Sequence, residues 1–197
     1  MKFRYCWLMA ALVFSSGCGK QEKLEAVSFY KVLNEKRAVF EKSNSLEKDF
    51  VGSVRGWVTS VTANGGGKGK GLDQNLAISN DLAKSVADIS AMVGQLRQAV
   101  YDLPLHSEFT QGVRSNMIGE LTRRQRLLQD FRGALQECAA SFDGFRQSRE
   151  YKGDSYPAGI DKLTKTLGSY HEPSDVVTEA TTALSTKYGL SEKDLGT

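Results

Sequence analysis

Cysteines are the side chains of this 197-residue chain best suited to covalent chemistry. Cys18 follows residues 15–17, which are Ser, Ser and Gly, and side chains this small let a processing enzyme bind the backbone closely. Cys138 lies among apolar residues at helical spacing, whereas a reactive thiol needs an exposed, electropositive position. We therefore expect a processing site next to Cys18 and an inert core residue at Cys138, with an intermolecular disulfide at Cys138 as the alternative.

The residues before Cys18 have the parts of a secretory signal. Lys2 and Arg4 form the basic start, and residues 5–14 (YCWLMAALVF) form the apolar middle. This middle is too short to span a membrane stably, because a transmembrane helix needs about 20 apolar residues. Together with residues 15–17 and Cys18, it resembles the signal of a bacterial lipoprotein.

This resemblance covers residues 1–18 and has one departure from the family pattern. Leucine is usual three residues before the cysteine, whereas this chain has Ser15 there and Phe14 one step further out. An ordinary secreted protein and a retained signal anchor are therefore the alternatives.

The resemblance implies a lipid anchor on a mature protein that comprises residues 18–197. Cys18 would receive a diacylglycerol before removal of residues 1–17, and two or more acyl chains, such as palmitate, hold a protein stably on a membrane. Gly19 follows the cysteine in place of Asp, which resembles the default that sends Gram-negative lipoproteins to the outer membrane. We expect an envelope protein anchored in the outer membrane and facing the periplasm.

The charge balance argues against a nucleic-acid partner. The chain has 26 basic and 23 acidic residues, and loss of Lys2 and Arg4 with the signal leaves 24 against 23. A nucleic-acid surface needs clustered basic residues, which this pattern lacks. Cys6 would leave with the signal and Cys18 would be acylated. Cys138 would then have no partner for an intramolecular disulfide, and stability would come from packing.

Residues 64–71 (NGGGKGKG) are rich in glycine but do not form a phosphate-binding motif. That motif needs Gly-Lys followed by Ser or Thr, and neither Lys68 nor Lys70 precedes a hydroxyl residue. We expect a flexible loop, with lysine contacts to lipid headgroups or an acidic partner as the alternative. His106 and His171 each stand alone in a turn near a proline, so we predict no metal site.

Arg123, Arg124 and Arg126 form the densest basic cluster of the chain. Glu120 and Asp130 lie within helical reach of them for ion pairs, which favours a solvated face. The alternative is a patch for an acidic partner or a phospholipid headgroup. We find no Gly-x-Ser-x-Gly nucleophile motif, and we predict no catalytic residue and no cofactor.

Apolar residues at alternating steps of three and four predict three long helices. The first begins near Gln21, and the polar run 43–45 is expected to bend or break it. The second covers residues 73–103 and ends before a proline, and the third covers residues 107–150, with a serine cap. The expected core positions are Phe29, Leu33, Phe40, Leu46, Phe50, Val54, Trp57 and Val61; Leu82, Val86, Ile89, Val93, Leu96, Val100 and Leu103; and Met117, Leu121, Leu128, Phe131, Leu135, Cys138, Phe142 and Phe145.

Short connections between long helices place neighbouring helices antiparallel. We therefore predict an all-α fold, an elongated antiparallel, coiled-coil-like bundle of three helices over residues 18–150. Residues 151–197 contain two short helical patterns, the second with a cap at Ser174, and a final turn capped by Ser191 and Asp194. We expect this segment to pack on the bundle, with a partner-binding arm as the alternative.

Together these features favour a non-enzymatic, membrane-anchored protein. Its helical bundle would serve as a scaffold or interaction module for other envelope components, with an envelope protein or a second copy as its partner. The alternative is the binding of a lipid or an apolar small molecule between the helices.

Overall fold

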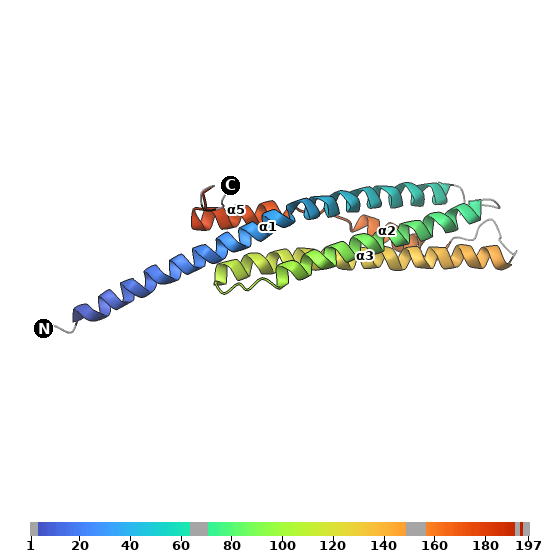
Figure 1. Cartoon of the computed structure of the whole chain (residues 1–197). Helices are drawn as coiled ribbons and strands as arrows, with labels where there is room; N and C mark the ends of the chain where they lie inside the picture. Colours follow the sequence, from blue (N-terminus) through green and yellow to red (C-terminus); the bar gives the residue numbers. More distant parts are fainter. Residues whose placement is uncertain (1–3, 64–70, 149–156, 192–193, 195–197) are drawn as a thin grey trace. The chain divides into compact units, whose positions relative to one another are not determined.

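The computed structural model describes residues 4–63, 71–148, 157–191 and 194, with side chains from residue 19 onward. These residues form α-helices and no strand, which confirms the predicted all-α class (Figure 1). Among the described helices, none is long and apolar enough to cross a membrane. The helices are α1 (Arg4–Ala63), α2 (Gly71–Tyr101), α3 (Glu108–Ser148), α4 (Ile160–Gly168) and α5 (Val176–Tyr188).

The limits of α2 and α3 agree closely with the predicted helices. Ser107 is the cap of α3 as predicted, because its hydroxyl accepts a hydrogen bond from the backbone N–H of Thr110 at 3.2 Å. Gly71, expected in the loop, is instead the first residue of α2. Residues 64–70 and 149–150 lie outside the described residues.

The course of α1 differs from the prediction at two places. It begins at Arg4 and not near Gln21, because the intervening residues include many good helix formers. It also continues as a helix through residues 43–45, so a break, which was one of the two expected outcomes there, does not occur. The hydroxyl of Ser43 is buried and accepts a hydrogen bond from Arg124 at 3.0 Å, so a tertiary partner engages it.

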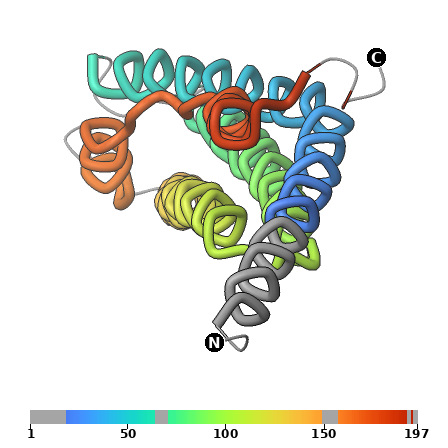
Figure 2. Tube along the Cα trace, turned by 90° about the vertical axis from the view of Figure 1, so that its left-hand side faces the viewer, coloured from blue at the N-terminus to red at the C-terminus, as the bar shows by residue number. Residues whose placement is uncertain are grey.

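By its contacts the chain divides into two compact units, whose limits fall inside α1, α2 and α3. Unit 1 comprises Met1–Ala38, Gln98–Glu120 and Asp175–Thr197, and unit 2 comprises Val39–Arg97 and Leu121–Ser174. Helix α4 belongs to unit 2 and α5 to unit 1. Residues 169–175 join these two helices without helical structure of their own (Figure 2).

Apolar side chains of α1, α3 and α5, the end of α2 and the α2–α3 connection form the core of unit 1. The buried members are Ala26, Phe29, Leu33, Val100, Leu105, Met117, Val176, Val177, Ala180 and Leu184. At the edge of this core, the ring of Phe109 stands edge-on to that of Tyr188, with 5.7 Å between the centroids. Helix α5 is thus held against the first turn of α3.

The core of unit 2 comes from α1, α2, α3 and α4. Its buried apolar members include Phe40, Phe50, Val54, Val61, Val86, Ile89, Val93, Leu96, Leu121, Leu128, Phe131, Leu135, Cys138, Phe142, Ile160 and Leu163. Phe50 meets Phe131 edge-on at 5.4 Å between ring centroids, and Trp57 meets Phe142 at 6.1 Å. These contacts confirm most of the predicted stripe positions as core.

Leu46 is the exception among the predicted core positions of α1. Its side chain is 37% exposed, whereas Ser43 and Glu47 are fully buried between Phe40 and Phe50. The buried positions 40, 43, 47 and 50 of α1 are three or four residues apart. The core face of α1 therefore follows the helical period even where the residues are polar. Leu46 therefore lies beside the core face.

The start of α4 packs closely against α3 because Gly159 has no side chain. The φ angle of Gly159 is 100°, in the left-handed region that favours glycine. A Cβ atom at this position would lie 2.4 Å from the carbonyl oxygen of Ala134. The N–H of Ala158 also donates to the hydroxyl of Ser141 at 3.0 Å, which ties the connection before α4 to α3.

Helix α5 is capped by Asp175 and not by Ser174, which we had predicted. The Asp175 carboxylate accepts a hydrogen bond from the N–H of Thr178 at 3.0 Å, as an N-cap residue does. Hydrogen bonds from Thr178 are the main cause that lowers the pKa of Asp175 below its usual 3.8. The helix ends at Gly189, which adopts the left-handed conformation with φ 57°.

Candidate functional site

A groove between α1 and α2 lies on the surface of unit 2. Its volume is about 340 Å³. The residues that line it recur every three or four positions on each helix, so each helix contributes one face. Its apolar lining is Leu46, Phe50, Leu82, Ile89 and Met92, and its polar lining is Asp49, Ser53, Ser85 and Asp88.

The polar lining of the groove is negatively charged. The hydroxyl of Ser53 donates to the backbone oxygen of Asp49 at 2.9 Å, and Ser85 makes the same kind of bond within α2. Asp49 and Asp88 are exposed, and neither carboxylate forms an ion pair with another described residue. The groove is therefore apolar inside, with one unpaired carboxylate on each helix.

A buried ion pair joins α1 and α3 in unit 2. The side chains of Arg124 and Glu47 are each 1% exposed. Glu47 Oε2 accepts hydrogen bonds from Arg124 Nε at 2.9 Å and lies 2.8 Å from Arg124 Nη2. The same Nη2 donates to Ser43 Oγ at 3.0 Å. Two sides of the guanidinium are thus matched by polar atoms of α1.

This pair overturns our expectation that Arg124 belongs to a solvated basic face with Arg123 and Arg126. Arg124 lies in the stripe between Leu121 and Leu128, and that stripe faces the core. Burial is possible because a carboxylate on α1 neutralises the charge. A guanidinium enclosed in this way cannot serve as a docking patch for an acidic partner or a phospholipid headgroup.

Tyr170, which follows α4, lies near the buried pair. Burial, with the nearby Glu47 carboxylate as a second cause, raises the pKa of Tyr170 to about 12. The Tyr170 hydroxyl and Arg124 Nη1 are buried and have no hydrogen-bond partner among the described residues. The cluster therefore brings side chains of α1, α3 and the connection after α4 close together.

Glu25 of α1 caps the N-terminus of α3 within unit 1. Its carboxylate accepts hydrogen bonds from the N–H of His106 at 2.8 Å, from the N–H of Ser107 at 3.0 Å and from the hydroxyl of Thr110. Burial acts to raise the pKa of Glu25, but these hydrogen bonds outweigh it and hold the pKa below the usual 4.5. The negative charge also suits the positive end of the helix dipole.

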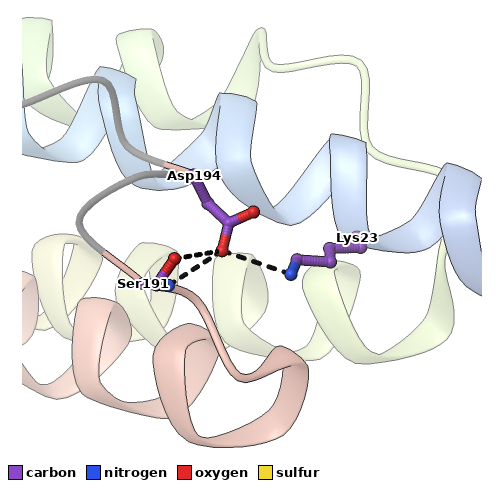
Figure 3. Close-up of polar contacts among 3 residues, drawn as sticks. All are labelled: Lys23, Ser191 and Asp194. Carbon is purple, nitrogen blue, oxygen red and sulfur yellow. Dashed lines mark hydrogen bonds and ion pairs between the residues drawn. The ribbon is translucent and has the colours of Figure 1, made fainter.

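Asp194 contacts Lys23 of α1 and Ser191 within unit 1 (Figure 3). Its Oδ2 accepts hydrogen bonds from the N–H and the hydroxyl of Ser191 at 2.9 and 2.8 Å, and it lies 3.2 Å from the Lys23 ammonium. The hydrogen bonds from Ser191, followed by that from Lys23, lower the pKa of Asp194 to about 2. Ser191 and Asp194 thus form the predicted turn contact, and Lys23 adds an ion pair that sequence patterns did not indicate.

Comparisons with protein families, curated proteins and solved structures give no match. We therefore infer function from the residues themselves, above all from the segment around Cys18 and from the groove between α1 and α2.

Two of the predicted sites lie outside what the structure describes. The side chain of Cys18 is not among the described ones, so its acylation stays a prediction. Lys68 and Lys70 belong to residues 64–70, which are also outside the described part.

Cys138 is buried, as predicted. Burial, with the neighbouring Glu137 charge as a second cause, raises the pKa of Cys138 to about 12. The sulfur is therefore a protonated thiol at neutral pH, which is a poor nucleophile.

Both histidines are exposed. His106 uses its backbone N–H in the Glu25 contact, and His171 lies in the connection between α4 and α5. Within the described residues, no group of three or more His, Cys, Asp or Glu side chains is arranged to hold a metal ion.

Sequence reasoning missed the polar residues that organise both units. Glu47 and Arg124 had a usable signal, because each is a charged residue at a stripe position and their charges are opposite. Glu25, Asp49 and Asp88 had no such signal, since acidic residues are common on exposed helix faces.

Proposed function

We propose that this chain is a lipid-anchored protein of a bacterial cell envelope, and that its helices form a non-enzymatic scaffold or interaction module for other envelope components. The observation that carries the proposal is Cys18 behind a basic start, the apolar stretch 5–14 and the small residues 15–17. An acylated Cys18 would confine the helices to a membrane surface and raise their effective concentration near partners there. Because Gly19 follows the cysteine, we propose the periplasmic face of the outer membrane.

We also propose that α1, α2 and α3 run up, down and up within unit 2. Trp57, late in α1, donates a hydrogen bond to Asn75, early in α2, at 3.1 Å, as antiparallel helices would allow. Phe50 contacts Phe131 and Trp57 contacts Phe142, so positions that advance along α1 meet positions that advance along α3. These contacts support antiparallel neighbours and a parallel α1–α3 pair.

A second candidate function is the binding of a lipid or an apolar small molecule between the helices. The α1–α2 groove favours it, because a volume of about 340 Å³ with an apolar lining lies within the usual range of small-molecule sites. Asp49 and Asp88 restrict this candidate, since a fatty acid or an acidic phospholipid would bring negative charge toward two carboxylates.

Metabolic labelling with an alkyne analogue of palmitate tests the anchor. The full chain should incorporate the label, and Cys18→Ala should lose it and leave membranes that are washed with high salt and carbonate. Cys6→Ala and Cys138→Ala are matched controls that should keep the label. Label on the Cys18→Ala protein, or its retention in washed membranes, would contradict the proposed lipid anchor.

Chemical cross-linking in native membranes tests the interaction role. The chain is cross-linked, purified gently and analysed for co-purifying proteins and lipids. A stoichiometric protein partner that is lost when exposed helix residues are changed supports a scaffold. A reproducible bound lipid without any protein partner would instead support the second candidate.

A further inference from the structure

We propose that the α1–α2 groove docks an amphipathic helix of a partner protein, whose apolar face fills the groove and whose lysine or arginine side chains pair with Asp49 and Asp88. This inference rests on the proposed interaction role, and it assigns that role a site and a partner chemistry.

The lining of the groove leaves apolar side chains uncovered in unit 2. Leu46 is 37% exposed, and Leu82 and Met92 are half-buried although they lie on the apolar faces of their helices. Phe50, which also lines the groove, is buried. The lining residues cover positions 46–53 of α1 and 82–92 of α2, about two to three turns of each helix. Apolar anchors at positions i, i+3 or i+4, and i+7 of a third helix have a similar extent.

The charges of the groove select a basic partner. Asp49 on α1 and Asp88 on α2 carry negative charge and form no ion pair with described residues. The hydroxyls of Ser53 and Ser85 donate within their own helices, so they do not supply donors to a bound anion. A helix with lysine or arginine beside its apolar face would satisfy both carboxylates and steer its own approach.

The same charges disfavour two other occupants. A symmetric dimer through this groove would place the same surface of each copy face to face, and would bring Asp49 and Asp88 of both copies together. An acidic lipid would add a negative headgroup to the two carboxylates. A cationic helix fits the apolar interior and the charged edge at once.

Peptide binding to the full chain in phosphatidylcholine nanodiscs tests this inference. The first probe is a fluorescent helical peptide of about 20 residues with a leucine stripe flanked by lysines. The second has the same leucines and glutamate in place of each lysine. We expect the lysine probe to bind at least roughly tenfold more tightly in an anisotropy titration, with an advantage that falls as salt rises.

Charge-reversal variants locate the binding site. Asp49→Lys and Asp88→Lys should each weaken the lysine probe and strengthen the glutamate probe. Asp130→Lys, the same change at an exposed position of α3, is the matched control and should alter neither affinity. Circular dichroism of each variant checks that the helices remain folded.

Equal affinity for the two probes, or no response to Asp49→Lys and Asp88→Lys, would overturn the proposed docking. Native mass spectrometry that finds a retained lipid, displaced by neither probe, would overturn it as well. Such results leave the anchor intact, because palmitate labelling of Cys18 tests that separately. If the chain takes up no palmitate label but still binds the lysine probe more tightly than the glutamate probe, the lipid anchor is refuted and the docking site is supported.

Discussion

A buried guanidinium such as that of Arg124 loses its hydration, and this loss is tolerable where a carboxylate and further acceptors surround it. Glu47 and Ser43 provide these groups from α1. The pair can contribute little net stability compared with apolar residues of similar size, but it strongly opposes any register in which one charge is buried alone. We therefore regard Arg124 and Glu47 as residues that align α1 with α3.

Removing one member of the Glu47–Arg124 pair should lower the free energy of unfolding more than replacing both members with apolar residues. Glu47→Ala leaves Arg124 as an unmatched buried charge and should lower the free energy of unfolding by about 3–5 kcal/mol. The double variant Glu47→Leu, Arg124→Met leaves no buried charge, so its free energy of unfolding should fall much less. Urea denaturation followed by circular dichroism measures both. A double variant as unstable as Glu47→Ala would contradict the proposed role of charge matching.

The N-termini of α3 and α5 each have a carboxylate that accepts hydrogen bonds from backbone N–H groups. Asp175 caps α5 from its own segment, whereas Glu25 caps α3 from a residue about 80 positions earlier in the chain. Because Glu25 belongs to α1, its contact caps the N-terminus of α3 and also holds α3 against α1.

The role of Asp175 as the cap of α5 can be tested by comparing its substitution with that of the neighbouring Ser174. Asp175→Ala should lower the free energy of unfolding by about 1 kcal/mol, because the N–H of Thr178 loses its acceptor. Ser174→Ala is the matched control and should change it little. Thermal melts of the two variants measure the difference. Equal losses would show that Asp175 does not act as the cap.

The Glu25 contact should make stability depend on pH. The pKa of Glu25 is lower in the folded chain than its usual 4.5, so its contribution is present above pH 4.5 and is lost as pH falls through the folded pKa. Glu25→Gln should therefore lower the melting temperature at neutral pH, and its difference from the native chain should shrink in acid. Melting curves over this range measure the effect, and a difference independent of pH would exclude an ionic cap.

At the scale of the whole molecule, the predicted apolar stripes contain positions that are buried in the core and positions that stay partly exposed to solvent. Leu96 is 3% exposed and Leu46 is 37% exposed, although both lie in apolar stripes that the sequence predicts as core. The same substitution at these two leucines should therefore have different results.

Leu96→Asp places an unpaired charge in the core of unit 2 and should cost several kcal/mol, enough to reduce the helical circular dichroism signal at moderate temperature. Leu46→Asp should cost much less, about 1 kcal/mol, because Leu46 is only partly buried and the new charge reaches solvent. Melting curves of both variants measure these effects. An unchanged melting temperature for Leu96→Asp would show that this stripe is not core.

Local patterns in the sequence were sufficient for most helix limits, though not for the start of α1, and for much of the core. Spacing of three and four residues, the proline after α2 and the hydroxyl of Ser107 act over a few residues, so they can be read without knowledge of the fold. The signal around Cys18 is local too, and the lipid anchor that it predicts depends on no tertiary contact.

Tertiary structure alone decided how the buried polar residues are paired and where the apolar surface is left open. A stripe on one helix cannot show that Arg124 meets Glu47, or that Leu46 falls beside the core, because both outcomes depend on how each helix is rotated against its neighbours. The same holds for the cap from Glu25 and for the groove edged by Asp49 and Asp88. Helical period depends on the local backbone, whereas burial, charge pairing and grooves arise where two distant segments meet.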